Sequence, residues 1–516
     1  MKALALPRDD RGLVAAGAIL TLLAYPPFHL IVPSFVCLVP AVMLIERGGT
    51  DPRPLRRQLV QGFWFGLAMH GLVLYWIAVA LWHFTKQSVL GYAATILILA
   101  MWTGVVFALT GWVVRATKLG IGLAFPVLWT AVEWIIGHQG DIEFPWLGLG
   151  TSLTGFPVLV QIADLVGARG VTFALAAANA ALALAWLKRA DRARARRLVT
   201  GVAVGIAMAA AYGAVRMRTI ETRPLGTVTL LQPAVGFQEK WDADLRQTIA
   251  ADLFAFHARA LHETDPDLVL WPEAALPGFL DGYPAWEERI RLLTAASGVP
   301  VVVGGIDLRK LSREDYEYFN AAFVFDRDGR RENSAPYHKR HLVPIVERVP
   351  FVNPRWFASL RWFGGFGVGA PGDVYAVGIG RFGILICYES AFEDVTRRYR
   401  RNGADFVANI TNDAWFGNTA APYQHAAHLV MRAIENRVGI ARAANTGISE
   451  FVDPLGRVSH ATRLGERTMV SGAVRTSNVR TFYTTMGDWV GTLALAGTLW
   501  LCGAAWWADR VRRRAP

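Results

Sequence analysis

The sequence predicts a polytopic α-helical membrane domain joined to an α/β domain, and three observations support this fold class. With 53% hydrophobic residues and a mean hydropathy of +0.29, the 516-residue chain is more apolar than soluble globular proteins normally are. Long apolar runs fill the two ends of the chain, whereas short β-branched runs alternate with amphipathic stretches between them. We therefore predict an N-terminal transmembrane domain of about seven helices (1–217), an α/β domain (218–485), and a C-terminal transmembrane helix with a basic tail (486–516).

The membrane domain is predicted from apolar runs that approach or exceed the roughly 20 residues needed to cross a bilayer. Pro26, Pro27 and Pro33 interrupt the first two runs, which is typical of a kinked hairpin. About eight crossings are predicted. The runs lie at 12–32, 33–45, 59–82, 88–114, 120–137, 170–187, 198–215 and 487–508.

The charges between these runs predict the orientation, because short loops that are rich in Lys and Arg stay in the cytoplasm. Basic residues alternate between the two sides, and the short loops on the poor side hold only Lys86 and Arg169. Both termini are therefore predicted to be cytoplasmic and the long segment 216–486 to lie outside. The basic side also accounts for the net charge of +12, so a nucleic-acid partner is not required. It holds Lys2, Arg8, Arg11, Arg47, Arg53, Arg56, Arg57, Arg115, Lys118, the cluster 188–197, Arg510, Arg512, Arg513 and Arg514.

The three cysteines single out one position. Cys37 and Cys502 lie in apolar runs and Cys387 in the outside domain, so no two of them can pair within one domain. An unpaired thiol outside the cytoplasm is unusual, because disulfides normally form there. Cys387 is therefore a candidate reactive thiol, and the alternative is a small buried hydrophobe at the end of a strand.

The α/β domain is predicted from strands interleaved with two amphipathic helices at 242–263 and 420–437. The sequence DPLG (453–456) within the last pair of strands predicts a hairpin turn. The predicted strands are 226–233, 267–273, 299–307, 320–326, 374–379, 382–389 and 405–411, with the pair at 442–458.

Reactive side chains follow three of these strands, and chemistry in such sheets usually sits at the carboxyl ends of strands. The strands end in Glu273, in Cys387 with Glu389 behind it, and in the group Asn412, Asp413 and Trp415. The segment 337–350 adds Lys339 and Glu347. A cysteine nucleophile needs a base and groups that hold an oxyanion. Glu273 can serve as the base, and Lys339 with the backbone N–H of Tyr388 can stabilise the oxyanion.

Other chemistries have weaker support in the sequence. His425 and His428 share a helix face at a spacing seen in metal sites, but no motif supplies further ligands, so we predict neither a metal nor a cofactor. A G-x-S-x-G elbow, a P-loop or a G-x-G-x-x-G element is not found at a strand–helix junction, which argues against serine hydrolases and nucleotide enzymes.

At these residues the chain resembles the carbon-nitrogen hydrolase (nitrilase) superfamily and, within it, the family of apolipoprotein N-acyltransferases. The resemblance is carried by WPEAALP (271–277), KRHLVPIVE (339–347), ICYE (386–389), residues 411–437 and ARAANTGIS (441–449), together with the apolar runs. It implies an αββα nitrilase-like domain with a Glu-Lys-Cys triad, on the periplasmic side of a bacterial inner membrane.

The resemblance further implies a ping-pong acyl transfer. Cys387 would take a fatty acyl chain from a phospholipid as a thioester and pass it to the α-amino group of a diacylglyceryl-modified cysteine at an apolipoprotein N-terminus. Glu273 would be the general base and acid, Lys339 the oxyanion stabiliser, and Glu347 a second carboxylate that positions the triad. Four further residues match positions that shape the site or bind substrate in the family: Trp241, Tyr388, Glu389 and Trp415.

Two features near Glu347 bear on this picture. Ile345 and Val346 stand where the family more often has Phe-Gly, so the backbone before Glu347 is expected to differ from the family's. The stretch 351–372 carries many aromatic residues among glycines, and we predict a mobile loop that gates acyl-chain entry. A core segment is the alternative. The predicted gating residues are Trp356, Phe357, Trp362 and Phe363.

Two other functions compete with this reading. One is a membrane-anchored amidase of the same superfamily that acts on a small amide, although about eight spans are more than an anchor needs. The other is a transporter or sensor with a catalytically inactive binding domain, which the intact set of Glu273, Lys339 and Cys387 disfavours.

Overall fold

A computed structural model describes residues 5–82, 89–312, 316–332, 336–353 and 365–514. The chain divides into two compact units. The first comprises 1–217 together with 488–516, and the second comprises 218–487. Each unit is described by itself.

The second unit is built on two sheets of six strands each within the described residues. The first sheet has the order β12-β1-β2-β3-β4-β5, and the second has the order β11-β10-β9-β8-β7-β6. The first sheet's strands are β1 (Arg223–Gln232), β2 (Leu268–Leu270), β3 (Val301–Lys310), β4 (Tyr316–Phe325), β5 (Tyr337–His338) and β12 (Thr468–Thr476). The second sheet's strands are β6 (Tyr375–Val377), β7 (Gly380–Ile386), β8 (Phe406–Thr411), β9 (Gly439–Ala444), β10 (Glu450–Val452) and β11 (Val458–Ser459).

The unbroken apolar runs of the central strands reflect burial on both faces of each sheet. In β3, Val302 belongs to the core between the two sheets, whereas Val301 and Val303 face the opposite side. Successive side chains of a strand point to opposite faces, so a strand covered on both sides must be apolar throughout. The two sheets therefore pack face to face, and each is covered again on its outer face.

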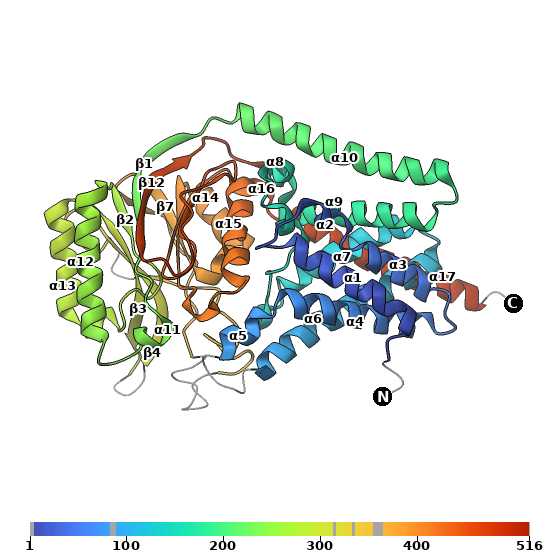
Figure 1. The fold of residues 1–516 in the computed structure, drawn as a ribbon, viewed down its shortest axis with the longest axis horizontal. Helices are drawn as coiled ribbons and strands as arrows, with labels where there is room; N and C mark the ends of the chain where they lie inside the picture. The colour runs from blue at the N-terminus through green and yellow to red at the C-terminus, as the bar shows by residue number, and fades with distance from the viewer. Residues whose placement is uncertain (1–4, 83–88, 313–315, 333–335, 354–364, 515–516) are drawn as a thin grey trace. The chain divides into compact units, whose positions relative to one another are not determined.

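Helices cover the outer faces and complete four layers (Figure 1). α12 (Arg246–Thr264) and α13 (Pro284–Ser297) pack on the first sheet through Leu253, Phe256 and Trp286. α14 (Glu393–Arg401) and α15 (Ala421–Asn436) lie against strands of the second sheet. This is the αββα arrangement that the resemblance implied.

Most predicted elements of this unit are present, and their ends differ by a few residues. The strand predicted at 382–389 ends at Ile386, because Cys387–Ala391 form a 3₁₀ turn. The DPLG turn joins β10 to β11, which pair antiparallel through Phe451 and Ser459. α13, α14 and β12 were not predicted, because α13 and α14 are rich in charged residues and β12 has many small and polar residues.

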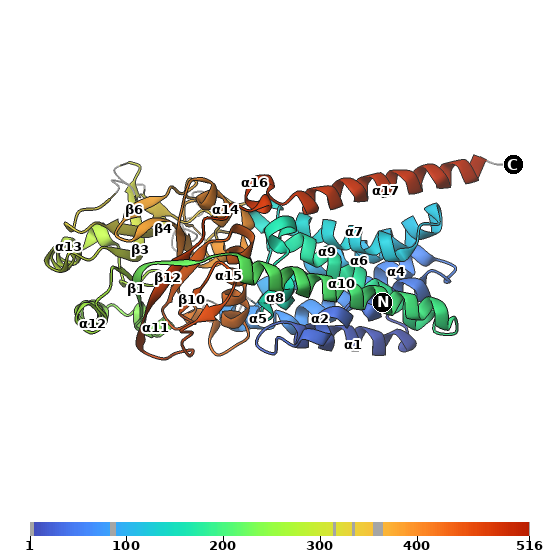
Figure 2. The same ribbon diagram turned by 90° about the horizontal axis from the view of Figure 1, so that it is seen from above.

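The first unit is a set of helices, and most of its long members lie roughly along one common axis in both views (Figures 1 and 2). They are α1 (Arg8–Ala24), α2 (Ile31–Val36), α3 (Val39–Gly48), α4 (Pro54–Val73), α5 (Trp76–Trp82), α6 (Val89–Thr117), α7 (Ile121–Ile136), α8 (Pro157–Val160), α9 (Ala163–Leu187), α10 (Arg192–Thr219) and α17 (Trp489–Arg514).

Among the described residues, five helical segments are long and apolar enough to cross a membrane, and α4 with α5 makes a sixth if that pair, bent by 57°, is one span. The other two predicted runs coincide with α1, of 17 residues, and α7, of 16 residues, which are shorter than the others. Each predicted run thus coincides with helix, while the count of eight crossings stays a prediction.

Two acidic residues are buried within this unit and are held by polar partners. Glu133 accepts hydrogen bonds from the Trp129 indole at 3.0 Å and the Thr172 hydroxyl at 2.9 Å. Asp164 accepts from the Tyr212 hydroxyl at 2.7 Å and pairs with Arg216 at 2.7 Å. These contacts agree with the expectation that acidic groups at membrane depth are paired.

Candidate active site

The three residues of the expected triad follow strand ends in the two sheets. Glu273 comes three residues after β2, Lys339 directly after β5, and Cys387 directly after β7. Each is almost fully buried, with relative exposures of 6%, 1% and 3%. The strand arrangement brings together side chains from three separate segments of the sequence.

The charged groups on the first sheet form a closed network. The Lys339 ammonium lies 2.9 Å from a carboxylate oxygen of Glu347 and 3.5 Å from Glu273 Oε1. Asn320, in β4, donates from Nδ2 to both carboxylates, at 2.6 Å to Glu273 and 2.9 Å to Glu347. The second oxygen of Glu273 accepts the backbone N–H of Asn412 at 2.8 Å. Two carboxylates can be close together here because a cation and amide donors stand between them.

Glu273 can occupy this position because the neighbouring residue of β3, Gly304, has no side chain. The chain after β2 crosses over Gly304 of β3, where Ala275 N–H donates to the Gly304 carbonyl at 2.8 Å. A Cβ at Gly304 would lie 2.1 Å from the Pro272 carbonyl oxygen and 2.7 Å from Glu273 Cα. Only glycine therefore permits this approach.

Cys387 stands at a sharp turn with an unusual backbone. Its φ of 50° lies in the left-handed region, which residues other than glycine seldom adopt. Glu389 supports the turn, because its Oε2 accepts the Ile386 N–H at 2.8 Å. The other carboxylate oxygen accepts the Tyr337 hydroxyl at 2.7 Å and the Arg340 N–H at 2.8 Å. Glu389 thus ties the cysteine turn to the segment that carries Lys339.

The electrostatics of the site favour a neutral thiol and a charged lysine. Burial, reinforced by Glu273, raises the pKa of Cys387 well above its ordinary value and outweighs the opposing effect of Lys339. For Lys339, burial lowers the pKa, but the negative charges of Glu347 and Glu273 outweigh it and leave the pKa above its ordinary value. Deprotonation of the thiol therefore needs a base when the substrate arrives.

A second buried lysine lies behind Glu273. Lys240 is 1% exposed, ends α11 (Phe237–Lys240), and donates from Nζ to the Glu273 carbonyl oxygen at 3.3 Å. Burial lowers its pKa to about 8, although the charge of Glu273 acts in the opposite direction. Sequence reasoning missed Lys240, and the available signal was its place next to Trp241.

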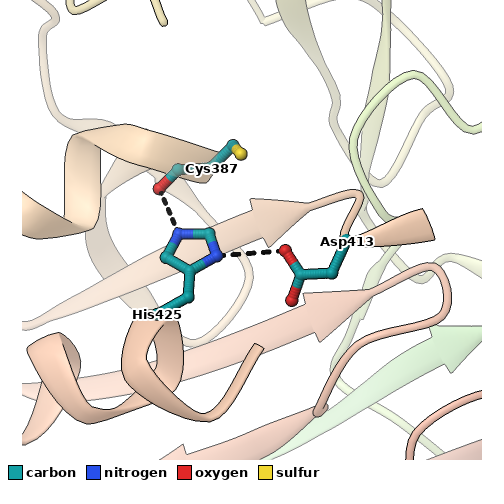
Figure 3. Close-up of side chains that lie close together, drawn as sticks. All are labelled: Cys387, Asp413 and His425. Atoms are coloured by element: carbon teal, nitrogen blue, oxygen red, sulfur yellow. Dashed lines mark hydrogen bonds and ion pairs between the residues drawn. The ribbon is translucent and has the colours of Figure 1, made fainter. Parts of the chain in front are cut away.

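Beneath the cysteine turn lies a buried polar cluster (Figure 3). Ligand-type atoms of Cys387, Asp413 and His425 lie within 4.8 Å of one another, a spacing that would suit a metal ion. However, the Nε2 atom of His425 bonds to the Cys387 carbonyl oxygen at 2.9 Å, and the Arg442 guanidinium pairs with Asp413 at 3.0 Å. The guanidinium already supplies the positive charge, so the donor set does not favour a cation.

This cluster keeps Asp413 ionised. Burial raises the pKa of its carboxyl, but His425 and Arg442 outweigh burial and hold the pKa below its ordinary value. Arg442 also donates to Asn409 at 2.7 Å, which fixes it between β8 and β9. The sequence had drawn attention to His425 only as one half of a weak metal-like pair with His428.

The four expected supporting residues occupy different environments. Glu389 and Tyr388 are buried, with exposures of 0% and 3%, and the hydrogen bonds of Glu389 support the cysteine turn. Trp241 is 48% exposed, and Trp415, which is half-buried, donates from its indole to the Asn412 carbonyl at 2.8 Å. The two tryptophans are the members of this set that have surface available for a substrate.

The turn before Glu347 has an unusual backbone conformation. Ile345 adopts a φ of 72°, a strained conformation for a β-branched residue. The turn is nevertheless closed, because Glu347 N–H donates to Val343 O at 3.0 Å and Glu347 Oε2 accepts the Val343 N–H at 2.8 Å. The predicted gating residues Trp356, Phe357, Trp362 and Phe363 fall within 354–364 and lie outside the described residues.

Comparisons with known proteins match both units. Residues 17–181 match the family model of the apolipoprotein N-acyltransferase N-terminal domain, and residues 227–483 match that of carbon-nitrogen hydrolases. An apolipoprotein N-acyltransferase from Geobacter metallireducens is 32% identical over 96% of this chain and 94% of its own length. One from Bradyrhizobium diazoefficiens is 33% identical over 93% and 92%. The solved structure of an amidase from a Nesterenkonia species is 19% identical over 52% of this chain and 95% of its own, with a TM-score of 0.38.

Proposed function

The chain belongs to the family of apolipoprotein N-acyltransferases, and we propose that Cys387 carries the acyl chain between donor and acceptor as a thioester. As a member of this family, the chain is an acyltransferase. The donor we propose is a membrane phospholipid, and the acceptor is the α-amino group of a diacylglyceryl-modified cysteine at an apolipoprotein N-terminus. Because each CH₂ group exposed to water costs about 0.8 kcal/mol, two-chain lipids stay in the bilayer. An enzyme with several apolar helices suits such substrates.

In the first half-reaction, Glu273 accepts the thiol proton while the sulfur attacks the ester carbonyl of the phospholipid. Lys339 stabilises the negative charge that develops on the carbonyl oxygen. The carbon–oxygen bond of the ester then breaks, and Glu273 returns the proton to the departing lysophospholipid. The products are a lysophospholipid and the Cys387 thioester.

In the second half-reaction, the neutral amino group of the acceptor attacks the thioester carbonyl. Glu273 takes a proton from the nitrogen, the carbon–sulfur bond breaks, and the proton passes to the Cys387 sulfur. Throughout both half-reactions, Glu347 and Asn320 keep Glu273 and Lys339 in position. The products are the N-acylated apolipoprotein and the original thiol.

One observation carries this proposal. A thiol held neutral in a buried site lies within the electrostatic field of a carboxylate and a lysine that are themselves paired. The carboxylate can accept a proton without leaving Lys339 unpaired, because Glu347 stays bound to the same ammonium. Proton transfer to Glu273 is therefore compatible with a charged oxyanion stabiliser.

The test is mass spectrometry of the purified protein after incubation with phospholipid. We expect a fatty acyl adduct on Cys387 that hydroxylamine removes and that Cys387→Ala lacks. Addition of a diacylglyceryl-modified peptide should discharge the adduct onto the peptide amine. If no adduct forms with phospholipid, or if only water and not the amine discharges it, the proposed acyl transfer is wrong, and the second result would favour a hydrolase.

We further propose that the protein spans the bacterial inner membrane with its second unit on the periplasmic side and both termini in the cytoplasm. The distribution of basic residues supports this placement. A cysteine introduced at exposed Glu263 should react with a membrane-impermeant maleimide in spheroplasts, which lack the outer membrane. A cysteine at exposed Arg189 should react only after permeabilisation. The opposite labelling pattern would reverse the orientation.

Residues 354–364 enter the proposal through their composition alone. Trp356, Phe357, Trp362 and Phe363 are proposed to dip into the membrane interface and gate acyl-chain entry. Replacing Trp356 and Phe357 with serine should raise the apparent KM for phospholipid in mixed micelles. Unchanged kinetics in this double variant would remove the gating role.

A further inference from the structure

The cysteine turn is held from below by a residue that the reaction scheme does not use. His425 projects from α15, is fully buried, and bonds through Nε2 to the main-chain oxygen of Cys387 at 2.9 Å. Figure 3 shows the two ends of Cys387 diverging: its carbonyl oxygen points to the imidazole, and its sulfur is turned away from it. The histidine therefore contacts the backbone of the residue and leaves the sulfur free.

We propose that His425 is a positioning residue that fixes the Cys387 turn by donating its Nε2–H to the Cys387 carbonyl. The inference rests on the proposed role of Cys387 as the acyl carrier. A carbonyl oxygen can only accept a hydrogen bond, so Nε2 must carry the proton. This holds whether His425 is neutral or charged, because the second proton would sit on Nδ1.

The turn requires such a bond for two reasons. A φ of 50° is costly for a residue with a side chain and persists only where the surroundings enforce it. Cys387 is also buried, and a buried carbonyl without a hydrogen-bond donor is destabilising. One buried N–H from α15 satisfies the carbonyl and fixes the direction of the peptide.

His425 is itself fixed by the second sheet. Its Nδ1 lies 3.0 Å from Asp413 Oδ1 and 3.1 Å from Arg442 Nη2. Asp413 follows β8, and Arg442 belongs to β9, which pairs with β8 in parallel. Through the His425 imidazole, the cysteine turn that follows β7 is therefore connected to Asp413 after β8 and to Arg442 in β9.

Two amide replacements separate the functions of the two ring nitrogens. The side-chain nitrogen of glutamine lies about as far from Cβ as Nε2 does, so His425→Gln retains a donor for the Cys387 carbonyl. In His425→Asn the amide reaches only as far as Nδ1 and leaves the carbonyl without its donor. The exposed residue His262 provides the control variant His262→Gln.

We expect His425→Asn to lower the single-turnover rate of Cys387 acylation about 100-fold, the size of effect that a misplaced reacting group produces. His425→Gln should stay within about threefold of the wild type, and KM for phospholipid should not change in either variant. Alkylation of Cys387 by iodoacetamide should fall in the same order, which tests the turn even if no acyl adduct forms. A merely structural role would instead lower the thermal midpoint and leave the two rates per folded molecule equal.

Equal losses in the two variants at equal thermal midpoints, or no loss in either, would overturn the proposal. If His425→Asn does not fold, the wild-type protein with ¹⁵N-labelled histidine gives the answer. The His425 signals, identified by their absence in His425→Gln, should show a protonated Nε2. An unprotonated Nε2 would exclude the hydrogen bond on which the proposal depends.

Discussion

The two sheets of the second unit contribute to the site in different ways. The first sheet supplies the charged side chains of Glu273 and Lys339, which pair with each other. Glu347 lies nearby, and the Asn320 amide donates a hydrogen bond to Glu273. The second sheet supplies the sulfur, and its residues control the direction of a backbone turn. The part of the site on the first sheet (the first half) is stabilised by ion pairs between its charged side chains. The part on the second sheet (the second half) is stabilised by hydrogen bonds to main-chain atoms. Changes that preserve shape should therefore damage the first half most, whereas changes that move a donor should damage the second.

Hydrogen bonds of Glu273 and of Glu389 join the two halves of the site. Asn412, after β8, donates its N–H to Glu273 on the first sheet. Glu389, on the cysteine turn, accepts from Tyr337 and from Arg340 N–H, at either side of Lys339. A shift in either sheet is thus transmitted to the other, and the halves can be separated only by side-chain changes that leave these contacts intact.

The largest effect that we expect comes from Glu273→Gln. The amide keeps nearly the same shape and can still accept the Asn412 N–H, but it cannot take a proton from the thiol. General-base catalysis contributes about 10²–10⁴-fold, so acylation of Cys387 in a single turnover should slow by about 10³-fold. The thermal midpoint of the variant serves as the control. A fall below tenfold would show that another group accepts the proton.

Lys240→Met tests how the buried Lys240 ammonium, which lies behind Glu273, affects stability. Because the pKa of Lys240 falls from 10.5 to about 8 on folding, the unfolded chain holds a proton that the folded chain lacks between pH 8 and 10.5. The wild type should therefore gain stability as the pH rises through this window, by about 3 kcal/mol at most. The variant should lack this gain. Thermal midpoints measured across the window test the prediction, and parallel curves for the two proteins would contradict it.

Asn320→Leu removes the donor that serves both carboxylates. Loss of a buried hydrogen-bond partner costs about 1–3 kcal/mol, so we expect the free energy of unfolding to fall by about 2 kcal/mol. Acylation should slow by about tenfold, because Glu273 loses one of its restraints. Asn320→Asp, which adds a third carboxylate beside Glu273 and Glu347, should be worse on both measures. Equal behaviour of the two variants would mean that Asn320 only fills space.

The smallest effect concerns the resting thiol on the second sheet. Burial and Glu273 raise the pKa of Cys387, so its thiolate fraction at pH 7 should be at least tenfold below that of an exposed cysteine. Iodoacetamide labelling, in a chain with Cys37 and Cys502 replaced by serine, should be slow at pH 7 and rise continuously to pH 9 and above. A plateau near neutral pH would indicate a preformed thiolate paired with Lys339.

The sequence predicted the triad because its chemistry follows strands that are easily recognised. Glu273 and Cys387 each end an apolar run, Lys339 stands in a segment that matches the family, and a lone thiol outside the membrane stood out by its rarity. Asn320 was not predicted, because a single polar residue within a strand acquires its meaning only when β4 lies beside β5. The roles of Lys240 and His425 were also not predicted, because they depend on how α11 and α15 pack in the folded unit. The membrane runs were located by apolarity alone, which does not decide how α4 and α5 share a crossing.

Gly304 extends this lesson to residues that have no chemistry. The chain that carries Glu273 closes over β3 only because Gly304 leaves room for the Pro272 carbonyl. A survey of all single substitutions scored by acyl transfer would therefore rank Gly304 with Glu273, Lys339 and Cys387. In such a survey Gly304 would tolerate substitution as poorly as Cys387 does, Gly304 because a side chain would collide with the Pro272 carbonyl and Cys387 because its sulfur reacts.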